Sequence, residues 1–277
     1  MSKTLSSQLS VSGHIDRAQF DSRATTGFKG KKADAEKALA AIGEELSDLQ
    51  EKLFAVGRSG AGNTRVLVVL QGMDTSGKGG IVRHVAGLVD PQGISITSFK
   101  KPTPEELEHD FLWRVEKALP GPGMIGIFDR SHYEDVLIGR VRGLADPAEI
   151  ERRYGAINDF EQAFTASGGV LLKSFLHITA EDQKERLEAR LEDPTKFWKY
   201  NTGDLDERAL WDDYQAAYAL AIERCSAVPW HLVPSGRKWY RNWAVATLLV
   251  EQLRALDLQW PAADFDVEAE KARLATM

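Results

Sequence analysis

The stretch Val66-Leu-Val-Val-Leu-Gln-Gly-Met-Asp-Thr-Ser-Gly-Lys-Gly-Gly80 decides the fold expected for this chain. Its first five residues are apolar and run straight into a glycine-rich turn that contains Lys78. A short, continuous apolar run of this kind predicts a strand buried on both faces of a parallel sheet. The residues from Gly72 to Lys78 match the phosphate-loop pattern of glycine, four residues, glycine and lysine. The sequence therefore predicts a strand, a phosphate loop and a helix in succession.

The loop predicts a site for phosphate. Glycines let the backbone curl so that N–H groups point at phosphate oxygens, and the lysine adds a full positive charge. The residues expected to bind phosphate here are Gly72, Thr75, Ser76, Gly77, Lys78, Gly79 and Gly80. The alternative is a tight strand-to-helix turn, in which Lys78 would face solvent.

Two residues distinguish this loop from that of an ordinary nucleoside triphosphate site. Gly79 stands where a Ser or Thr hydroxyl usually holds magnesium, and Asp74 places a carboxylate among the phosphates. A carboxylate in such a place makes sense with a metal between it and the phosphate, or with a role in the transfer itself. We therefore expect Asp74 to be catalytic.

Composition limits the possible functions. The chain has 277 residues, a net charge of −6 and one cysteine, Cys225. The net charge provides no global positive field for nucleic acid, and no apolar run approaches the length of a membrane span. A lone cysteine without a recognisable signal peptide fits a reducing compartment. We expect a cytoplasmic protein with neither nucleic acid nor membrane as partner.

The order of elements predicts an α/β protein, a three-layer α/β/α sandwich around a parallel five-stranded sheet. An N-terminal region, residues 1–62, should hold an extended arm and an amphipathic helix over 33–54, packed on the body or on a second subunit. The core should cover 63–277, with a helical insertion at about 181–226. Strands are expected at Val66–Leu70, Ile94–Phe99, Met124–Phe128, Val170–Ile178 and Val228–Val233.

A second motif follows the third expected strand, which runs into Asp129 and Arg130. Parallel strands end along one edge, so Asp129 should face the phosphate loop, where Asp74 and Asp129 would hold a metal. Arg130 beside it could stabilise a phosphoryl group in transfer. The alternative is that Asp129 only caps the helix at Tyr133. For His132, a structural hydrogen bond is as good a prediction as a catalytic role.

The helical insertion carries Arg186 and Arg190, which lie four apart and so share one helix face. They could clamp successive phosphates, or they could pair with neighbouring carboxylates on the helix. Trp198, Trp211 and Tyr214 could stack a base, although aromatic core is the simpler reading. A basic groove for a long polyanion has four candidates, Arg83, Lys100, Arg140 and Arg142.

Over nearly its whole length the sequence resembles the family-2 polyphosphate kinases. The residues that carry the resemblance are the loop from Gly72 to Ile81, the stretch from Phe128 to Leu137, Asp193-Pro-Thr-Lys-Phe-Trp-Lys199, Ala227-Val-Pro-Trp230 and Lys238-Trp-Tyr-Arg-Asn242. The resemblance implies a thymidylate-kinase-like fold with the insertion as a lid. By position it implies functional roles for Asp74, Lys78, Asp129, Arg130 and Arg190.

The resemblance also implies the reaction, a reversible transfer of the terminal phosphate of inorganic polyphosphate to nucleotides, dependent on Mg²⁺ (or Mn²⁺). The version Ser131-His-Tyr-Glu-Asp-Val is similar to that of the subgroup accepting both AMP and ADP, and guanine nucleotides are further candidate acceptors. We expect a homo-oligomer, a dimer or tetramer. Two other functions stay open, a nucleoside monophosphate kinase with ATP as donor and a non-catalytic nucleotide or polyphosphate sensor.

Overall fold

The computed structural model describes residues 3–16 and 19–277. These residues form a six-stranded sheet in the order β1-β6-β5-β2-β4-β3. The strands are β1 (Ser10–Val11), β2 (Arg65–Gln71), β3 (Ile94–Ser98), β4 (Ile125–Asp129), β5 (Gly169–His177) and β6 (Trp230–Pro234).

The predicted sheet needs one correction. The five expected strands are present and pair in parallel, with β2 at the centre between β4 and β5. A sixth strand, β1, pairs with the edge strand β6 in the antiparallel sense, through Ser10 and Val11. The prediction of a five-stranded, wholly parallel sheet was therefore wrong at this edge, because a two-residue strand is too short to show alternation in the sequence.

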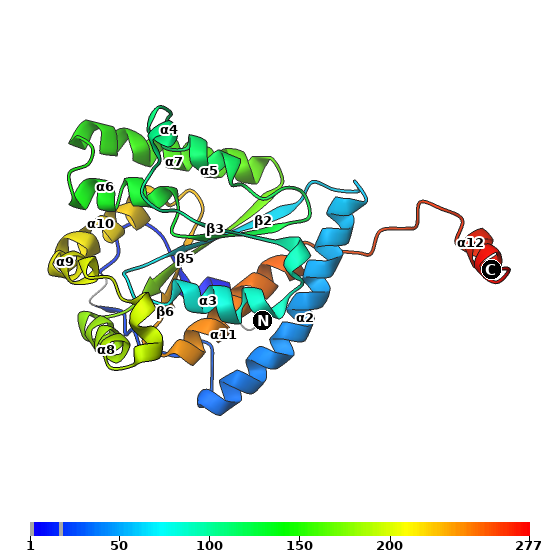
Figure 1. Ribbon diagram of the computed structural model, residues 1–277, viewed down its shortest axis with the longest axis horizontal. Helices are drawn as coiled ribbons and strands as arrows, with labels where there is room; N and C mark the ends of the chain where they lie inside the picture. The colour runs from blue at the N-terminus through cyan, green and yellow to red at the C-terminus, as the bar shows by residue number, and fades with distance from the viewer. Residues whose placement is uncertain (1–2, 17–18) are drawn as a thin grey trace.

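Helices cover both faces of the sheet (Figure 1). In Figure 1, α2, α3 and α11 lie on one side of the sheet and α4 to α7 on the other. The α-helices are α1 (Leu5–Leu9), α2 (Lys32–Arg58), α3 (Lys78–His84), α4 (Pro104–Leu107), α5 (Trp113–Lys117), α6 (Ile138–Val141), α7 (Pro147–Ala166), α8 (Ala180–Leu191), α9 (Gly203–Ala209), α10 (Trp211–Arg224), α11 (Lys238–Arg254) and α12 (Val267–Leu274). Short 3-10 helices are η2 (Ala86–Leu88), η3 (Pro91–Gly93), η4 (His132–Asp135) and η5 (Pro194–Lys199).

The central strand shows why the two layers form. Leu67 and Val69 of β2 belong to the core under α5, α7 and α10, whereas Val66, Val68 and Leu70 belong to the core under α2 and α11. Successive side chains of a strand point to opposite faces, so a continuous apolar run supplies both cores at once. This confirms the prediction of a doubly buried strand.

The N-terminal region is packed onto the sheet and its helices. The amphipathic helix predicted over 33–54 is α2, which packs along α11 of its own chain and buries Leu46 and Leu53. Before it, Arg23 forms an ion pair of 2.7 Å with Asp182, and the Tyr240 hydroxyl donates to the Thr26 carbonyl. The boundary expected at residue 62 stays a prediction.

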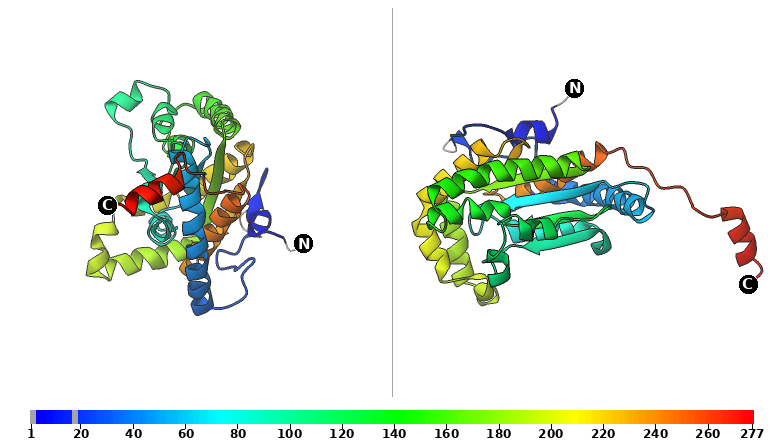
Figure 2. Two further views of the ribbon diagram at one scale, coloured as in Figure 1. Left: turned by 90° about the vertical axis from the view of Figure 1, so that its right-hand side faces the viewer. Right: turned by 90° about the horizontal axis from the view of Figure 1, so that it is seen from above.

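The helical insertion (residues 180–224) comprises α8, η5, α9 and α10 and lies at the carboxyl-end edge of the parallel strands (Figure 1). Its action as a lid stays a prediction. At the other end of the chain, α12 stands clear of the core on an extended segment, as Figure 1 and the right-hand view of Figure 2 show. None of the described helices is long and apolar enough to cross a membrane.

Candidate active site

The phosphate loop leaves β2 at Gln71 and turns through left-handed backbone. Gly72 has φ 147° and Gly77 has φ 112°, conformations that favour glycine. A Cβ at Gly72 would also approach the Leu176 carbonyl oxygen to 2.8 Å. Thr75 has φ 66° without being glycine, so the loop holds a strained residue at its tip.

Lys78 lies inside this loop, 8% exposed. Its Nζ donates to the carbonyl oxygen of Gly72 at 2.6 Å and to that of Met73 at 3.4 Å. Burial lowers the pKa of Lys78, while the carboxylate of Asp74 opposes the shift. The alternative in which this lysine only faces solvent is wrong, and its ammonium group is held at the centre of the loop.

Two hydroxyl groups of the loop are buried without a hydrogen-bond partner among the described residues, Thr75 Oγ1 and Ser76 Oγ. Buried hydroxyls are usually paired, so an unpaired one is often the mark of a missing ligand or water. Both groups lie in the segment that the sequence predicts to bind phosphate.

The strand register places the second motif beside the loop. Asp129 ends β4 and pairs with Leu70 of β2, one residue before β2 ends. Arg130 follows with φ 66°, and its Nη2 donates to Asp74 Oδ1 at 3.0 Å. The next short helix is capped by the Ser131 hydroxyl, so Asp129 is not its cap. Burial opposes ionisation of Arg130, but the carboxylates of Glu134 and Asp74 raise its pKa.

A buried cluster of hydrogen-bonded side chains supports the turn that follows Arg130. Glu161 of α7 accepts from the Tyr133 hydroxyl at 2.6 Å and from Lys173 Nζ at 2.5 Å, and His132 Nε2 lies 3.4 Å from the same carboxylate. Lys173 also donates to the carbonyl oxygen of Cys225, at the end of α10. His132 is therefore a structural residue that helps to fix η4 next to Arg130.

Two cavities of opposite charge meet at the loop. The larger, the basic trough, has a volume of about 830 Å³, and the described residues that line it include ten Lys and Arg but only two carboxylates. Its lining consists of Asp74, Thr75, Gly77, Lys78, Gly79, Gly80, Arg83, His84, Ser98, Phe99, Lys100, Asp129, Arg130, Arg186, Ala189, Arg190, Lys196, Trp198, Lys199, Lys238, Arg241 and Asn242.

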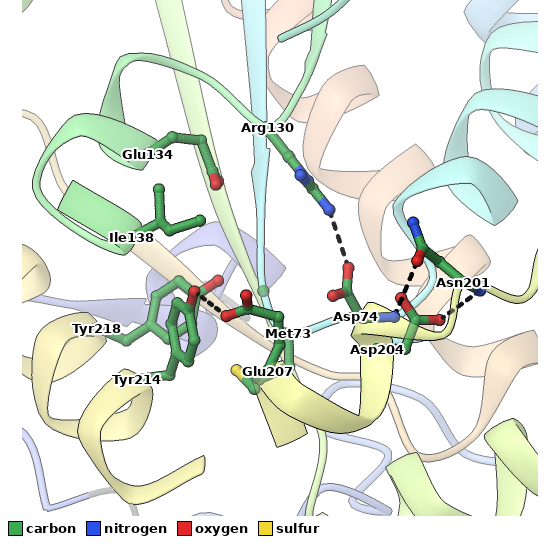
Figure 3. A pocket seen from close by; sticks show the side chains of 12 residues that line it. Met73, Asp74, Arg130, Glu134, Ile138, Asn201, Asp204, Glu207, Tyr214 and Tyr218 are labelled. Atoms are coloured by element: carbon green, nitrogen blue, oxygen red, sulfur yellow. Dashed lines mark hydrogen bonds and ion pairs between the residues drawn. The ribbon is translucent and has the colours of Figure 1, made fainter. Parts of the chain in front are cut away.

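The smaller cavity, the acidic pocket, has a volume of about 230 Å³ and lies between the loop and the insertion (Figure 3). Burial raises the pKa of Glu134, against the effect of Arg130, and burial with the nearby Asp74 raises that of Asp204. The pocket is lined by Gly72, Met73, Asp74, Arg130, Glu134, Ile138, Asn201, Gly203, Asp204, Glu207, Tyr214 and Tyr218. Asp74 and Arg130 therefore line both cavities.

The two arginines of the insertion take different places. Arg186 donates to the Thr75 carbonyl at 2.8 Å and to the Ser235 carbonyl at 2.5 Å, so it ties the loop to the segment between β6 and α11. Arg190 donates to Lys199 O at 2.9 Å and forms a 3.2 Å ion pair with Asp204. Both line the basic trough, and within the described residues neither forms an ion pair with a carboxylate of its own helix, which was the alternative to a role at the phosphates.

The structure brings together nearly all of the predicted site residues. All of them line the basic trough except Gly72, which lines the acidic pocket, and Ser76, which is buried behind the loop. Of the groove candidates, Arg83 and Lys100 line the trough, whereas Arg140 and Arg142 do not. Arg142 pairs instead with Glu207 at 2.8 Å.

Sequence reasoning missed several lining residues. Lys238, Arg241 and Glu134 all lie in stretches that carried the resemblance, which was the available signal for them. Asp204, Glu207 and Tyr218 had no such signal. Among the aromatic candidates, Trp198 is 79% exposed at the trough, whereas Tyr214 is 8% exposed and Trp211 packs on the core.

A divalent cation would need phosphate to complete its site. No three or more His, Cys, Asp or Glu side chains within the described ranges converge into a ready metal cage. Mg²⁺ is usually held by one or two carboxylates together with substrate phosphates and water. Asp74 and Asp129 line the same trough, which the unpaired Thr75 also lines, so these residues fit a cation that arrives with phosphate.

The parallel sheet, the phosphate loop and the basic trough define a phosphate-loop phosphotransferase. The family model for Polyphosphate kinase 2 matches residues 29–260. The chain is 44% identical over 251 residues to the AMP/ADP-polyphosphate phosphotransferase of Meiothermus ruber, covering 90% of this chain and 92% of that protein. It is 39% identical to the ADP-polyphosphate phosphotransferase of Rhodopseudomonas palustris, over 79% of this chain and 78% of that one.

Solved structures agree. The crystal structure of polyphosphate kinase 2 from Arthrobacter aurescens is similar with a TM-score of 0.96 at 53% identity, over 99% of this chain and 98% of that one. This chain belongs to the polyphosphate kinase 2 family.

Proposed function

We propose that the protein transfers the terminal phosphate of inorganic polyphosphate to ADP, giving ATP, and to AMP, giving ADP, in a reversible reaction. The observation that carries this proposal is the meeting of a basic trough and an acidic pocket at Asp74 and Arg130. The names of the relatives from Meiothermus ruber and Rhodopseudomonas palustris support the choice of substrates.

The charges of the two cavities support a separate place for each substrate. Polyphosphate carries a negative charge on every unit, so it belongs in the trough, where Lys and Arg outnumber carboxylates. The acidic pocket would repel such a chain. Its carboxylates, from Glu134, Asp204 and Glu207, can instead accept hydrogen bonds from ribose hydroxyls and base amino groups, and Tyr214 and Tyr218 offer aromatic faces (Figure 3). The nucleotide therefore enters the pocket with its phosphate toward Asp74.

The chemistry follows from this placement. A terminal phosphate oxygen of the nucleotide, already ionised at neutral pH, forms the new P–O bond. The bond between the last phosphorus of polyphosphate and its bridging oxygen breaks, and the shortened chain keeps that oxygen and its electron pair. A strong general base is not needed, so alignment and charge carry the rate. Lys78 and Arg130 stabilise the charge in transfer, and Arg190 is a further candidate from the insertion.

Mg²⁺, or Mn²⁺, would be held by Asp74 and Asp129 together with phosphate oxygens, and when bound it would offset charge between donor and acceptor. Asp74 also holds Arg130 by the 3.0 Å bond, so it orients the arginine on the boundary between the substrates.

The test is an assay of the purified protein with long-chain polyphosphate, Mg²⁺ and AMP, ADP or GDP, with the nucleotides separated by chromatography. We expect ATP from ADP and ADP from AMP, and the GDP reaction measures the tolerance for guanine. Phosphorylation by ATP alone would favour a nucleoside monophosphate kinase. Binding of both substrates without turnover would favour a sensor.

A further inference from the structure

Arg241 is a trough residue with an unusual environment. It lies in the first turns of α11, is 3% exposed and lines the basic trough. Its Nη1 donates to the Ser76 carbonyl oxygen at 3.3 Å, and its Nη2 donates to Asn242 Oδ1 at 2.8 Å. Both acceptors are neutral, so the guanidinium makes hydrogen bonds but no ion pair there.

The charge of Arg241 is not compensated by any carboxylate that pairs with it in the described part of the chain. Burial, and then the positive charge of Arg186, lowers the pKa of Arg241 to about 9. Lys238, one turn earlier, also has a lowered pKa, through burial and then the positive charges of Arg186 and Arg241. Buried charges are normally paired, so this end of the trough is a place where an anion would be stabilised.

Two glycines of the phosphate loop leave the space that the guanidinium fills. A Cβ on Gly77 would lie 1.6 Å from Arg241 Nη1, and one on Gly80 would lie 2.4 Å from Nη2. A Cβ on Gly79 between them would meet nothing within 4 Å. Gly77 also needs its positive φ, but Gly80 lies in α3 without one, where alanine is ordinarily the better residue. Contact with Arg241 is thus a reason for glycine at position 80.

We propose that Arg241 is a positioning residue for the donor: its guanidinium, seated against Gly77 and Gly80, holds the phosphate loop from behind and supplies the positive charge that polyphosphate compensates. This inference rests on the proposed function, and it adds a specific role for α11. It also gives a reason for the glycine at position 80, since a side chain there would push the guanidinium away.

The test is a set of variants, each characterised by two measurements. Arg241→Gln removes the charge and Arg241→Lys keeps it, whereas Gly80→Ala displaces the guanidinium and leaves residue 241 unchanged. The double variant Gly80→Ala with Arg241→Gln measures their coupling, and Gly79→Ala, alone and with Arg241→Gln, is the matched comparison. The first reading is KM for polyphosphate, KM for ADP and kcat. The second is the rise in melting temperature caused by sodium tripolyphosphate without nucleotide.

We expect Arg241→Gln to raise KM for polyphosphate about tenfold, the loss typical of one charged hydrogen bond, with KM for ADP within about twofold. Gly80→Ala should do the same, and the double variant should be no worse than either single one. Arg241→Lys should recover most of the loss, whereas Gly79→Ala should have equal effects in both backgrounds. Tripolyphosphate should stabilise the Gln variant less than the parent.

Three results would overturn the inference: effects of Gly80→Ala and Arg241→Gln that multiply, equal changes in both KM values, or equal stabilisation of parent and Arg241→Gln by tripolyphosphate. A parent protein that tripolyphosphate does not stabilise and polyphosphate does not serve would instead contradict the proposed function, so the two failures are distinct.

Discussion

The substitution Asp74→Asn tests the boundary between the two cavities. Asparagine keeps the size of the side chain and one oxygen acceptor, but it loses the charge that faces Arg130 at 3.0 Å. If Asp74 orients that arginine and a metal-bound phosphate, turnover should fall about a hundredfold, as when one transition-state contact is removed. That loss corresponds to about 2.7 kcal/mol of activation free energy. The concentration of Mg²⁺ needed for half-maximal rate should also rise, because one anionic partner is gone.

The same substitution should barely change the stability of the fold. The side chains of Arg130 and Asp74 are 42% and 28% exposed, and ion pairs in such positions contribute at most about 1 kcal/mol to the free energy of unfolding. For a chain of this size the melting temperature should therefore drop by no more than about 4 °C. A large loss of rate with a small loss of stability separates a catalytic role from a structural one.

The assay is initial rate against Mg²⁺ concentration for the parent and for Asp74→Asn, with the melting temperature of each. Asp110→Asn is a matched control, because Asp110 pairs with Arg152 at 2.7 Å but lines neither cavity. The control should keep the parent's rate and Mg²⁺ curve. A near-normal rate with an unchanged Mg²⁺ curve in Asp74→Asn would show that this carboxylate only braces the turn, and would refute the reasoning.

Three further predictions follow from buried groups. Lys78→Ala should lower kcat by about a hundredfold in the polyphosphate assay, since the only side-chain cation inside the described loop is lost, and a near-normal kcat would contradict this role. Glu161→Gln should lower the free energy of unfolding in urea by about 3–5 kcal/mol, because Lys173 would be left buried without its partner; a change below about 1 kcal/mol would disagree. Cys225 is fully buried and burial raises its pKa to about 12, so iodoacetamide at about pH 8 should spare the folded protein and modify it once in urea; rapid reaction of the folded form would disprove the burial.

Local signals in the sequence were sufficient where a few neighbouring residues decide the structure. The helix start at Thr103 is a capping box, with Thr103 Oγ1 accepting from Glu106 N and Glu106 Oε2 accepting from Thr103 N, and a Thr followed three residues later by Glu is the sequence signature of such a start. At the start of α7, Asp146 Oδ1 likewise accepts from Glu149 N, and Asp is one of the residues preferred at this position. The position of Asp129 beside the loop also followed, because parallel strands end along one edge.

Other features depend on residues far apart in the chain. The edge strand β1 has two residues, and its pairing with β6 carries no periodic pattern. The acidic pocket is lined by Glu134 and by Asp204 and Glu207 of the insertion. These residues are far apart in the sequence and come together only when the insertion packs against the core. Arg142 was a predicted groove residue, but in the structure it forms an ion pair with Glu207, which the sequence does not indicate.

The sequence by itself determined the central strand, the phosphate loop and the chemistry of its charged residues. The reason is that hydrophobic periodicity, the placement of glycines and the residues at a strand's end can all be read from a few neighbouring positions. Only the tertiary structure decided which basic side chain, distant in sequence, packs against the glycines of the phosphate loop. Arg241 contacts the loop 165 positions away, and no local pattern states that its guanidinium lies against Gly80. The physical reason is that packing depends on shape and on distance in space, and the sequence lists neither.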